Sequence, residues 1–190
     1  GLINWVTKGI FLGHRKIYLT PQSDDLFRES DLFLSSDPFC QPNCPKLRIS
    51  GADLNRVAQW QDSWTTRAQT ARFKTTFAYN GFDALSQTGA LSNDSLVNSV
   101  RSNASRFFWV SHTYDHENLD CFLRDANNGV CRPATYSESL SEISRNVAVA
   151  NSLKLTLDRA SIVTPEISGL YNPDFLRAAS SQGIRFMVSE

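Results

Sequence analysis

The sequence lacks an excess of either charge and lacks any long apolar run, and both absences narrow the function classes. Its 19 Lys and Arg residues balance 19 Asp and Glu residues, so the positive excess that an electrostatic nucleic-acid binder requires is missing. No apolar run approaches the roughly 20 residues that cross a membrane. Hydrophobic residues nevertheless make up 41% of the 190 residues. We therefore expect a globular domain with one substantial core and with neither nucleic acid nor a membrane span among its partners.

Cysteine is scarce: the chain has four, which form two local pairs in different sequence surroundings. Cys40 and Cys44 lie in a proline-dotted stretch, whereas Cys121 and Cys131 bracket a polar turn. Four cysteines allow three pairings, of which pairing within each local couple is the simplest. A four-cysteine zinc site is the alternative, although the spacings differ from the usual CxxC pairs. Disulfides favour an oxidising compartment.

The glycosylation triplets add to the extracellular argument, and the start of the chain indicates a processed or excised piece. Asn93 and Asn103 each begin an Asn-x-Ser triplet, which is a glycan acceptor in secreted proteins. The chain begins with Gly1 rather than Met and shows no basic-then-apolar leader, as expected of a processed or excised piece of a longer protein. We therefore predict a secreted, extracellular glycoprotein.

Short β-branched or aromatic runs alternate with helical segments along the chain. Such alternation predicts an α/β fold with a parallel sheet and right-handed crossovers. No glycine-rich phosphate loop follows the first run, which argues against a nucleotide-binding sheet. Five strands are too few to close a β/α barrel, so we expect a distorted (β/α) barrel truncated at its C-terminal side. The expected strands are 16–20, 73–79, 106–111, 161–164 and 184–188, and the expected helices are 50–71, 94–104, 137–153 and 173–182.

The first helix has a recognisable start. Ser50 precedes Asp53 by three residues, a pattern that resembles a capping box. Apolar residues recur at helical spacing from there onward, and we expect Trp60 and Trp64 to belong to the core rather than to a ligand platform. The residues placed on this buried face are Leu54, Val57, Trp60, Trp64 and Ala68.

Titratable and polar residues follow the strands at the ends where β/α folds gather their active sites. Because these ends lie on one rim of the sheet, we expect the side chains to converge there. The residues in question are Asp24 and Asp25 after the first strand, Asn80 and Asp83 after the second, His112, Asp115, His116 and Glu117 after the third, and Glu166 after the fourth.

The two histidines on this rim lie four residues apart. His112 and His116 at this spacing can share one cation as a two-nitrogen half-site. The acidic pair Asp24-Asp25 can add an oxygen ligand and leave one carboxylate free as a base, which is the open arrangement of catalytic zinc-type sites. The alternative for the acidic pair is a solvated turn, and a histidine pair alone also occurs on ordinary surfaces.

At these residues the sequence resembles the NodB-homology polysaccharide deacetylases. The stretch 20–25, Thr-Pro-Gln-Ser-Asp-Asp, is similar to the first motif of that family, and His112-Thr113-x-x-His116 is similar to its second. Within that family the sequence most resembles the secreted fungal galactosaminogalactan deacetylases. This resemblance implies a protein associated with cell walls or biofilms.

This resemblance implies that residues 1–190 form the N-terminal and central part of a catalytic domain. It implies that Asp24 is the general base and that Asp25, His112 and His116 bind a divalent metal, with zinc favoured over cobalt or nickel. The implied reaction is metal-assisted hydrolysis that removes N-acetyl groups from an N-acetylgalactosamine or N-acetylglucosamine polysaccharide. The implied protein is a monomer, attached to a carbohydrate-binding domain.

Two departures from the family pattern affect the remaining site residues. The third motif normally reads Arg-x-Pro-Tyr, whereas this chain has Thr164-Pro165-Glu166. The histidine that acts as general acid in the family has no counterpart here and is expected beyond residue 190. For the substrate-binding wall we assign Pro165, Glu166, Asn80 and Tyr114. Aromatic residues in the long irregular stretches 21–49 and 112–136 either stack on sugars or form small cores: Phe27, Phe33, Phe39, Tyr114 and Phe122.

Two other function classes stay open from the residues alone. A glycoside hydrolase on the same barrel would use a carboxylate pair such as Asp25 and Glu166, and it would have no use for the two histidines. A non-catalytic carbohydrate-binding module with a degenerate site would bind polymer regardless of metal.

Overall fold

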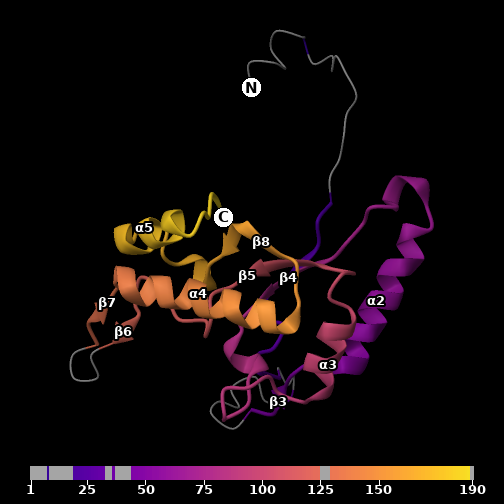
Figure 1. Ribbon diagram of the computed structural model, residues 1–190, viewed down its shortest axis with the longest axis horizontal. Helices are drawn as coiled ribbons and strands as arrows, with labels where there is room; N and C mark the ends of the chain where they lie inside the picture. Colours follow the sequence, from indigo (N-terminus) through magenta and orange to yellow (C-terminus); the bar gives the residue numbers. More distant parts are fainter. Residues whose placement is uncertain (1–7, 9–18, 33–35, 37–43, 125–128, 189–190) are drawn as a thin grey trace.

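Five parallel strands form the central sheet of the computed structural model, which describes residues 8, 19–32, 36, 44–124 and 129–188 (Figure 1). Their order in space equals their order along the chain, so the sheet shows no point at which the order reverses. In a doubly wound sheet the strand order reverses at such a point, whereas in a β/α barrel the strands follow one another around the barrel in chain order. The predicted β/α barrel class is thus confirmed. The strands are β1 (Gln22–Ser23), β4 (Thr76–Tyr79), β5 (Phe108–Ser111), β8 (Leu157–Val163) and β9 (Phe186–Val188).

Within the described residues, four α-helices flank this sheet in two packed pairs. α2 (Gly51–Thr65) packs against α3 (Ser95–Ser102), and α4 (Tyr136–Leu153) packs against α5 (Pro173–Ser181), as Figure 1 shows. Among the described residues, no helix has the length and apolar character needed to cross a membrane. The part of the chain that the structure describes also contains three short 3₁₀ helices: η1 (Ala68–Thr70), η2 (Phe82–Ala84) and η3 (Pro165–Ile167).

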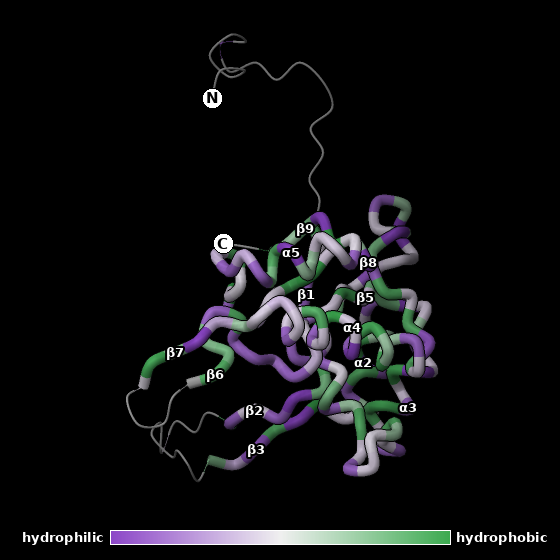
Figure 2. Tube along the Cα trace, turned by 60° about the vertical axis from the view of Figure 1, so that its left-hand side comes forward, coloured by the Kyte–Doolittle hydropathy of each residue, from purple (hydrophilic) through white to green (hydrophobic). Residues whose placement is uncertain are grey.

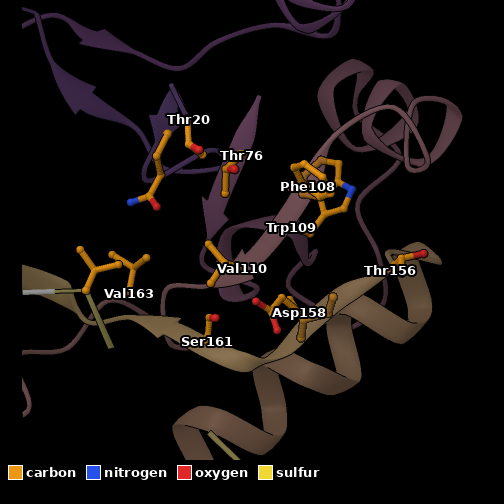
Figure 3. Close-up of a pocket in the computed structure, with 12 residues that line it drawn as sticks. Thr20, Thr76, Phe108, Trp109, Val110, Thr156, Asp158, Ser161 and Val163 are labelled. Carbon is orange, nitrogen blue, oxygen red and sulfur yellow. The ribbon is translucent and has the colours of Figure 1, made fainter. Parts of the chain in front are cut away.

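Side chains alternate across the sheet and give its two faces different roles. Phe77 and Trp109 stack on one face with ring centroids 5.7 Å apart and belong to the main core, which also contains residues of α2, α3 and α4. On the opposite face, Ala78, Val110 and Val163 form a small cluster of their own. Figure 3 shows Val110 and Val163 lining a hollow of about 500 Å³ on this second face. The helices therefore cover one face, as in a β/α barrel wall.

Helix starts follow the sequence closely. Ser50 and Asp53 form a reciprocal capping box at the start of α2, as predicted, and Thr135 and Glu138 form a second one at the start of α4. Each box satisfies backbone N–H groups that the first helical turn leaves without partners. These local hydrogen bonds explain why the sequence located the helix starts well.

The prediction for the buried face of α2 is wrong at its two tryptophans. Trp60 is 48% exposed and Trp64 is 37% exposed. Leu54 is buried as predicted and Val57 packs against the core, whereas Ala58 and Gln61 take the buried positions that were expected of the tryptophans. The helix ends at Thr65, before the expected residue 68, and its buried face lies at a different angle around the helix axis from the predicted one. The two tryptophans pack edge-to-face against each other, and Trp60 also packs edge-to-face against Phe73.

The first strand and the long irregular stretches also differ from expectation. The described strand lies at Gln22–Ser23, after the expected 16–20, of which 16–18 lie outside the described residues. Pairing with β4, rather than β-propensity, selects this segment. The irregular stretches contain antiparallel hairpins that project from the sheet (Figure 2): β2 (Ser30–Asp31) with β3 (Lys46–Leu47), and β6 (Leu123–Arg124) with β7 (Cys131–Arg132).

One predicted disulfide is confirmed, and one glycan position is disfavoured. Cys121 and Cys131 are bonded across the β6–β7 hairpin. The predicted partner of Cys44, Cys40, lies outside the described residues. Asn103 is only 6% exposed, and its side-chain nitrogen, the atom that a glycan would occupy, donates to Asn55. Asn93 is exposed and keeps the glycosylation prediction.

Candidate metal centre

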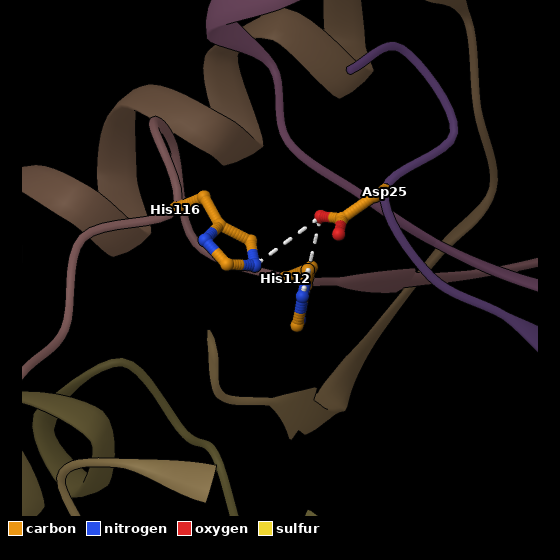
Figure 4. Close-up of side chains that lie close together, drawn as sticks. All are labelled: Asp25, His112 and His116. Atoms are coloured by element: carbon orange, nitrogen blue, oxygen red, sulfur yellow. Dashed lines mark ion pairs between the residues drawn. The ribbon is translucent and has the colours of Figure 1, made fainter. Parts of the chain in front are cut away.

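Three of the predicted ligands converge at the carboxyl ends of the strands. Asp25 follows β1, whereas His112 and His116 follow β5, and the three side chains point toward one another in Figure 4. The distance from Asp25 Oδ1 to His116 Nε2 is 3.4 Å, and to His112 Nε2 it is 3.5 Å. The ligand atoms of all three lie within 4.8 Å of one another. The sheet thus brings together an acid and two imidazoles that lie far apart in the sequence.

These distances fit a shared cation. Two donors bound at about 2.1 Å with a tetrahedral angle between them lie about 3.4 Å apart. In addition, Asp25 Oδ1 is a buried atom that has no hydrogen-bond donor among the described residues. A buried carboxylate oxygen normally has a partner. An ion between the carboxylate and the imidazoles would provide it.

His112 is oriented by its other ring nitrogen. Its Nδ1 lies 3.0 Å from the carbonyl oxygen of Val163, which makes Nδ1 the protonated nitrogen and leaves the Nε2 lone pair facing Asp25. Burial lowers the pKa of His112 and favours the neutral, ligating form. The backbone of His112 is also held in place. Its backbone N–H donates to Tyr79 O at 3.1 Å, and its backbone carbonyl accepts from Asn80 Nδ2.

An irregularity in β8 places the Val163 carbonyl. As β5 advances by one residue, from Val110 to Ser111, its partner moves from Asp158 to Ile162. The extra residues bulge out of the ladder and shift the end of β8 relative to β5. Bulges of this kind often adjust residues beside active sites.

The backbone around the centre is strained. Of the seven non-glycine residues with positive φ among the described part of the chain, five lie at this rim. Such conformations cost about 1–3 kcal/mol each and persist only where the surroundings enforce them. They are Asp25, Thr113, His116, Glu166 and Ile167, with φ between 53° and 67°.

A cavity of about 340 Å³ opens over the three ligands. Asp24 lies on its wall, is exposed, and accepts a hydrogen bond from Gln22 Nε2 at 3.0 Å. Glu166 lies on the wall as well, and its Oε2 accepts from Asn118 Nδ2 at 2.6 Å. The full lining is Gln22, Asp24, Asp25, His112, His116, Val163, Thr164, Glu166, Ile167 and Val188.

Three residues assigned to the substrate wall do not line this cavity. Asn80 is fully buried and holds the His112 carbonyl, as described above. Tyr114 is 4% exposed and packs edge-to-face with Phe82. Pro165 is buried within η3. Phe27 and Tyr114 both belong to the main core rather than to small loop cores, and both side chains are buried.

Sequence reasoning missed Glu142, a charged residue buried beneath the histidine loop. Burial, together with the nearby Asp115 carboxylate, raises the pKa of Glu142 to about 7. The available signal was its helical spacing: Glu142 adjoins the core position Ile143 and precedes the buried Asn146 by one turn. A charged side chain is rarely fully buried unless it has a partner, so a Glu at a core position of the helix was the feature to examine.

Comparison with known proteins identifies a family model and a solved structure that this chain resembles. A family model described as the Agd3 deacetylase domain matches residues 88–190, more than half of the chain, including both histidines. The fold is similar to the crystal structure of Agd3, described as a novel carbohydrate deacetylase, with a TM-score of 0.72 and 22% identity over 98% of this chain and 34% of that chain. The chain thus spans about a third of that protein's length. No curated protein matches.

Proposed function

Because the chain belongs to the Agd3 deacetylase domain family, we propose that it is the metal-dependent part of an enzyme that removes N-acetyl groups from an amino-sugar polysaccharide. The observation that supports this most directly is the Asp25–His112–His116 group, whose donor distances suit one divalent cation. The cavity above it is open enough to admit a sugar residue.

Asp25, His112 and His116 would hold the cation, and two nitrogens with one oxygen favour zinc, with cobalt or nickel as substitutes. When bound, such a cation lowers the pKa of water and polarises a carbonyl. The chain's own residues prepare the site, since Val163 O fixes the tautomer of His112 and the sheet fixes its distance from Asp25.

Asp24 is the proposed general base. It lies next to Asp25 in the sequence, yet it is exposed and lines the cavity, so its carboxylate can meet a water molecule there. It accepts the proton of the water that attacks the acetamide carbon, and the C–N bond then breaks to give acetate and a free amine. The leaving amine requires a proton, and we propose that a histidine outside residues 1–190 supplies it.

Glu166 is the remaining polar wall residue that we assign to sugar binding. Its carboxylate is held at the cavity by Asn118, where it can accept hydrogen bonds from sugar hydroxyls. A glycosidase with Asp25 and Glu166 as its acids is less favoured, because Asp25 Oδ1 faces two imidazoles. The polymer is an N-acetylgalactosamine or N-acetylglucosamine polysaccharide.

We further propose that the protein is secreted and that residues 1–190 are one part of a longer catalytic domain. The Cys121–Cys131 disulfide and the exposed Asn93 triplet support an oxidising, extracellular location. The threefold greater length of the structural relative supports the larger domain.

Acetate release from N-acetylated galactosamine and glucosamine oligomers tests the proposal on the protein in its full length. Asp24→Asn should retain the bound metal and lose acetate release by at least 100-fold, the scale of a lost general base. Glu117→Gln is the matched control, because it removes an exposed carboxylate one residue after His116 without touching the cavity. Full activity of Asp24→Asn would place the base elsewhere, and the absence of acetate release by the metal-loaded wild type would remove the proposed activity.

A further inference from the structure

Glu142 is a carboxylate buried where the proposed chemistry does not use it. It lies on α4, is 3% exposed, and approaches the loop that joins His112 to His116. Its Oε2 accepts two backbone hydrogen bonds, from Tyr114 N at 3.0 Å and from Asp115 N at 3.2 Å. Burying a carboxylate is unfavourable unless hydrogen bonds compensate for the lost hydration. The two backbone N–H groups of this loop provide that compensation among the described residues.

The loop needs such a constraint. Thr113 and His116, which flank Tyr114 and Asp115, have φ values of 62° and 67°, and this left-handed conformation is unfavourable for residues other than glycine. The carbonyl groups of the loop are also held: Tyr114 O accepts from Phe82 N at 2.9 Å, and Asp115 O accepts from Arg28 Nη1 at 3.0 Å. Glu142 supplies the matching acceptor for both N–H groups.

The two histidines are therefore positioned by different means. His112 is fixed from the sheet, through Tyr79 O and Val163 O. His116 lies past the strained loop, and its orientation depends on how that loop is held. Glu142 on α4 therefore contacts the backbone that leads to His116, whereas the contacts that hold the His112 ring come from the sheet.

We propose that Glu142 is a positioning residue of the metal centre: its carboxylate holds the 113–116 loop in the conformation that directs His116 Nε2 toward Asp25. This inference rests on the proposed metal site, and it assigns to the core of α4 a role in metal affinity. Residues that hold a metal ligand in place through hydrogen bonds typically contribute 10–100-fold to metal affinity.

The test compares two substitutions of similar size. Glu142→Met removes the acceptor and keeps the apolar volume, whereas Glu142→Gln keeps one acceptor oxygen without charge. We expect the Co²⁺ dissociation constant, measured by competition with a chromophoric chelator, to rise about 10–100-fold in Glu142→Met and about threefold in Glu142→Gln. The visible absorption bands of bound Co²⁺, which report the ligand geometry, should change in Glu142→Met.

Ile143→Val is the matched control, because Ile143 is buried on the same helix in a cluster that contains neither histidine. It should lower the unfolding temperature and leave the Co²⁺ affinity and spectrum unchanged. A wild-type affinity and spectrum in Glu142→Met would reduce Glu142 to a purely structural residue and overturn the proposal. If Glu142→Met does not fold, wild-type affinity in Glu142→Gln overturns it instead. Failure of the wild type to bind Co²⁺ would refute the metal site itself, a separate outcome.

Discussion

Stabilisation by metal offers a measure of the Asp25–His112–His116 site that does not depend on turnover. A ligand that binds only the folded chain, at a free concentration of about 100 times its dissociation constant, adds about 2.7 kcal/mol to the free energy of unfolding. A chain of 190 residues has an unfolding entropy of about 400 cal/mol/K. The two values together give a rise in unfolding temperature of about 7 °C when Zn²⁺ or Co²⁺ is added.

Asp25→Asn should remove nearly all of this rise. The substitution keeps the shape of the side chain and replaces the charged oxygen that lies 3.4 and 3.5 Å from the two imidazole nitrogens with a neutral amide. A 100-fold loss of affinity at the same metal concentration leaves about 0.4 kcal/mol, or a rise of about 1 °C. Without metal the variant should be at least as stable as the wild type, because Asp25 Oδ1 has no donor among the described residues, whereas an amide N–H₂ can donate to an imidazole.

Asp24→Asn is the internal control for this experiment. It makes the same chemical change one residue away, on an exposed side chain that lies outside the ligand group. Thermal unfolding by circular dichroism, with and without metal, should show the full rise for Asp24→Asn. The reasoning is refuted if Asp25→Asn keeps the wild-type rise, or if both variants lose it equally.

Three further predictions concern stability. Replacing Cys121 and Cys131 by Ser should lower the free energy of unfolding by about 3 kcal/mol, since their separation of 10 residues closes a loop of moderate entropy; an unchanged urea midpoint would contradict this. Asn146→Ala should cost about 3 kcal/mol in chemical denaturation, because its buried side chain makes three hydrogen bonds that join α4 to the ends of β4 and β5; a loss below about 1 kcal/mol would show that the strands do not need this residue. Hydrogen bonds from Arg132 and from the capped helix start lower the pKa of Glu138 from 4.5 to about 2, so its contribution is fully present above pH 4.5 and is lost as the pH falls toward 2. Because the group is partly exposed, we expect about 1 kcal/mol, visible as a difference between wild type and Glu138→Gln that disappears in urea titrations between pH 5 and pH 2.

The sequence was informative wherever a few neighbouring residues decide the structure. The capping box at Ser50 and Asp53 needs only four residues, and the structure contains it. The Cys121–Cys131 bridge likewise closes a short segment. Tryptophan burial in α2 was mispredicted because it depends on where the helix meets α3 and the sheet, and the periodic pattern alone leaves that rotation free.

For the site, the sequence by itself determined which atoms are available: two imidazoles four residues apart and a pair of carboxylates after an earlier strand. The family resemblance had already assigned Asp25 to the metal and Asp24 to the base, and in the structure Asp25 faces the imidazoles. Only the tertiary structure shows that the Val163 carbonyl holds the His112 ring and that the Glu142 carboxylate accepts from the loop before His116. The physical reason is the range of the forces involved. Residue type and local hydrogen bonds act over a few residues, whereas a ligand geometry of a few ångströms arises from strand register, a bulge and a strained loop that distant segments hold in place.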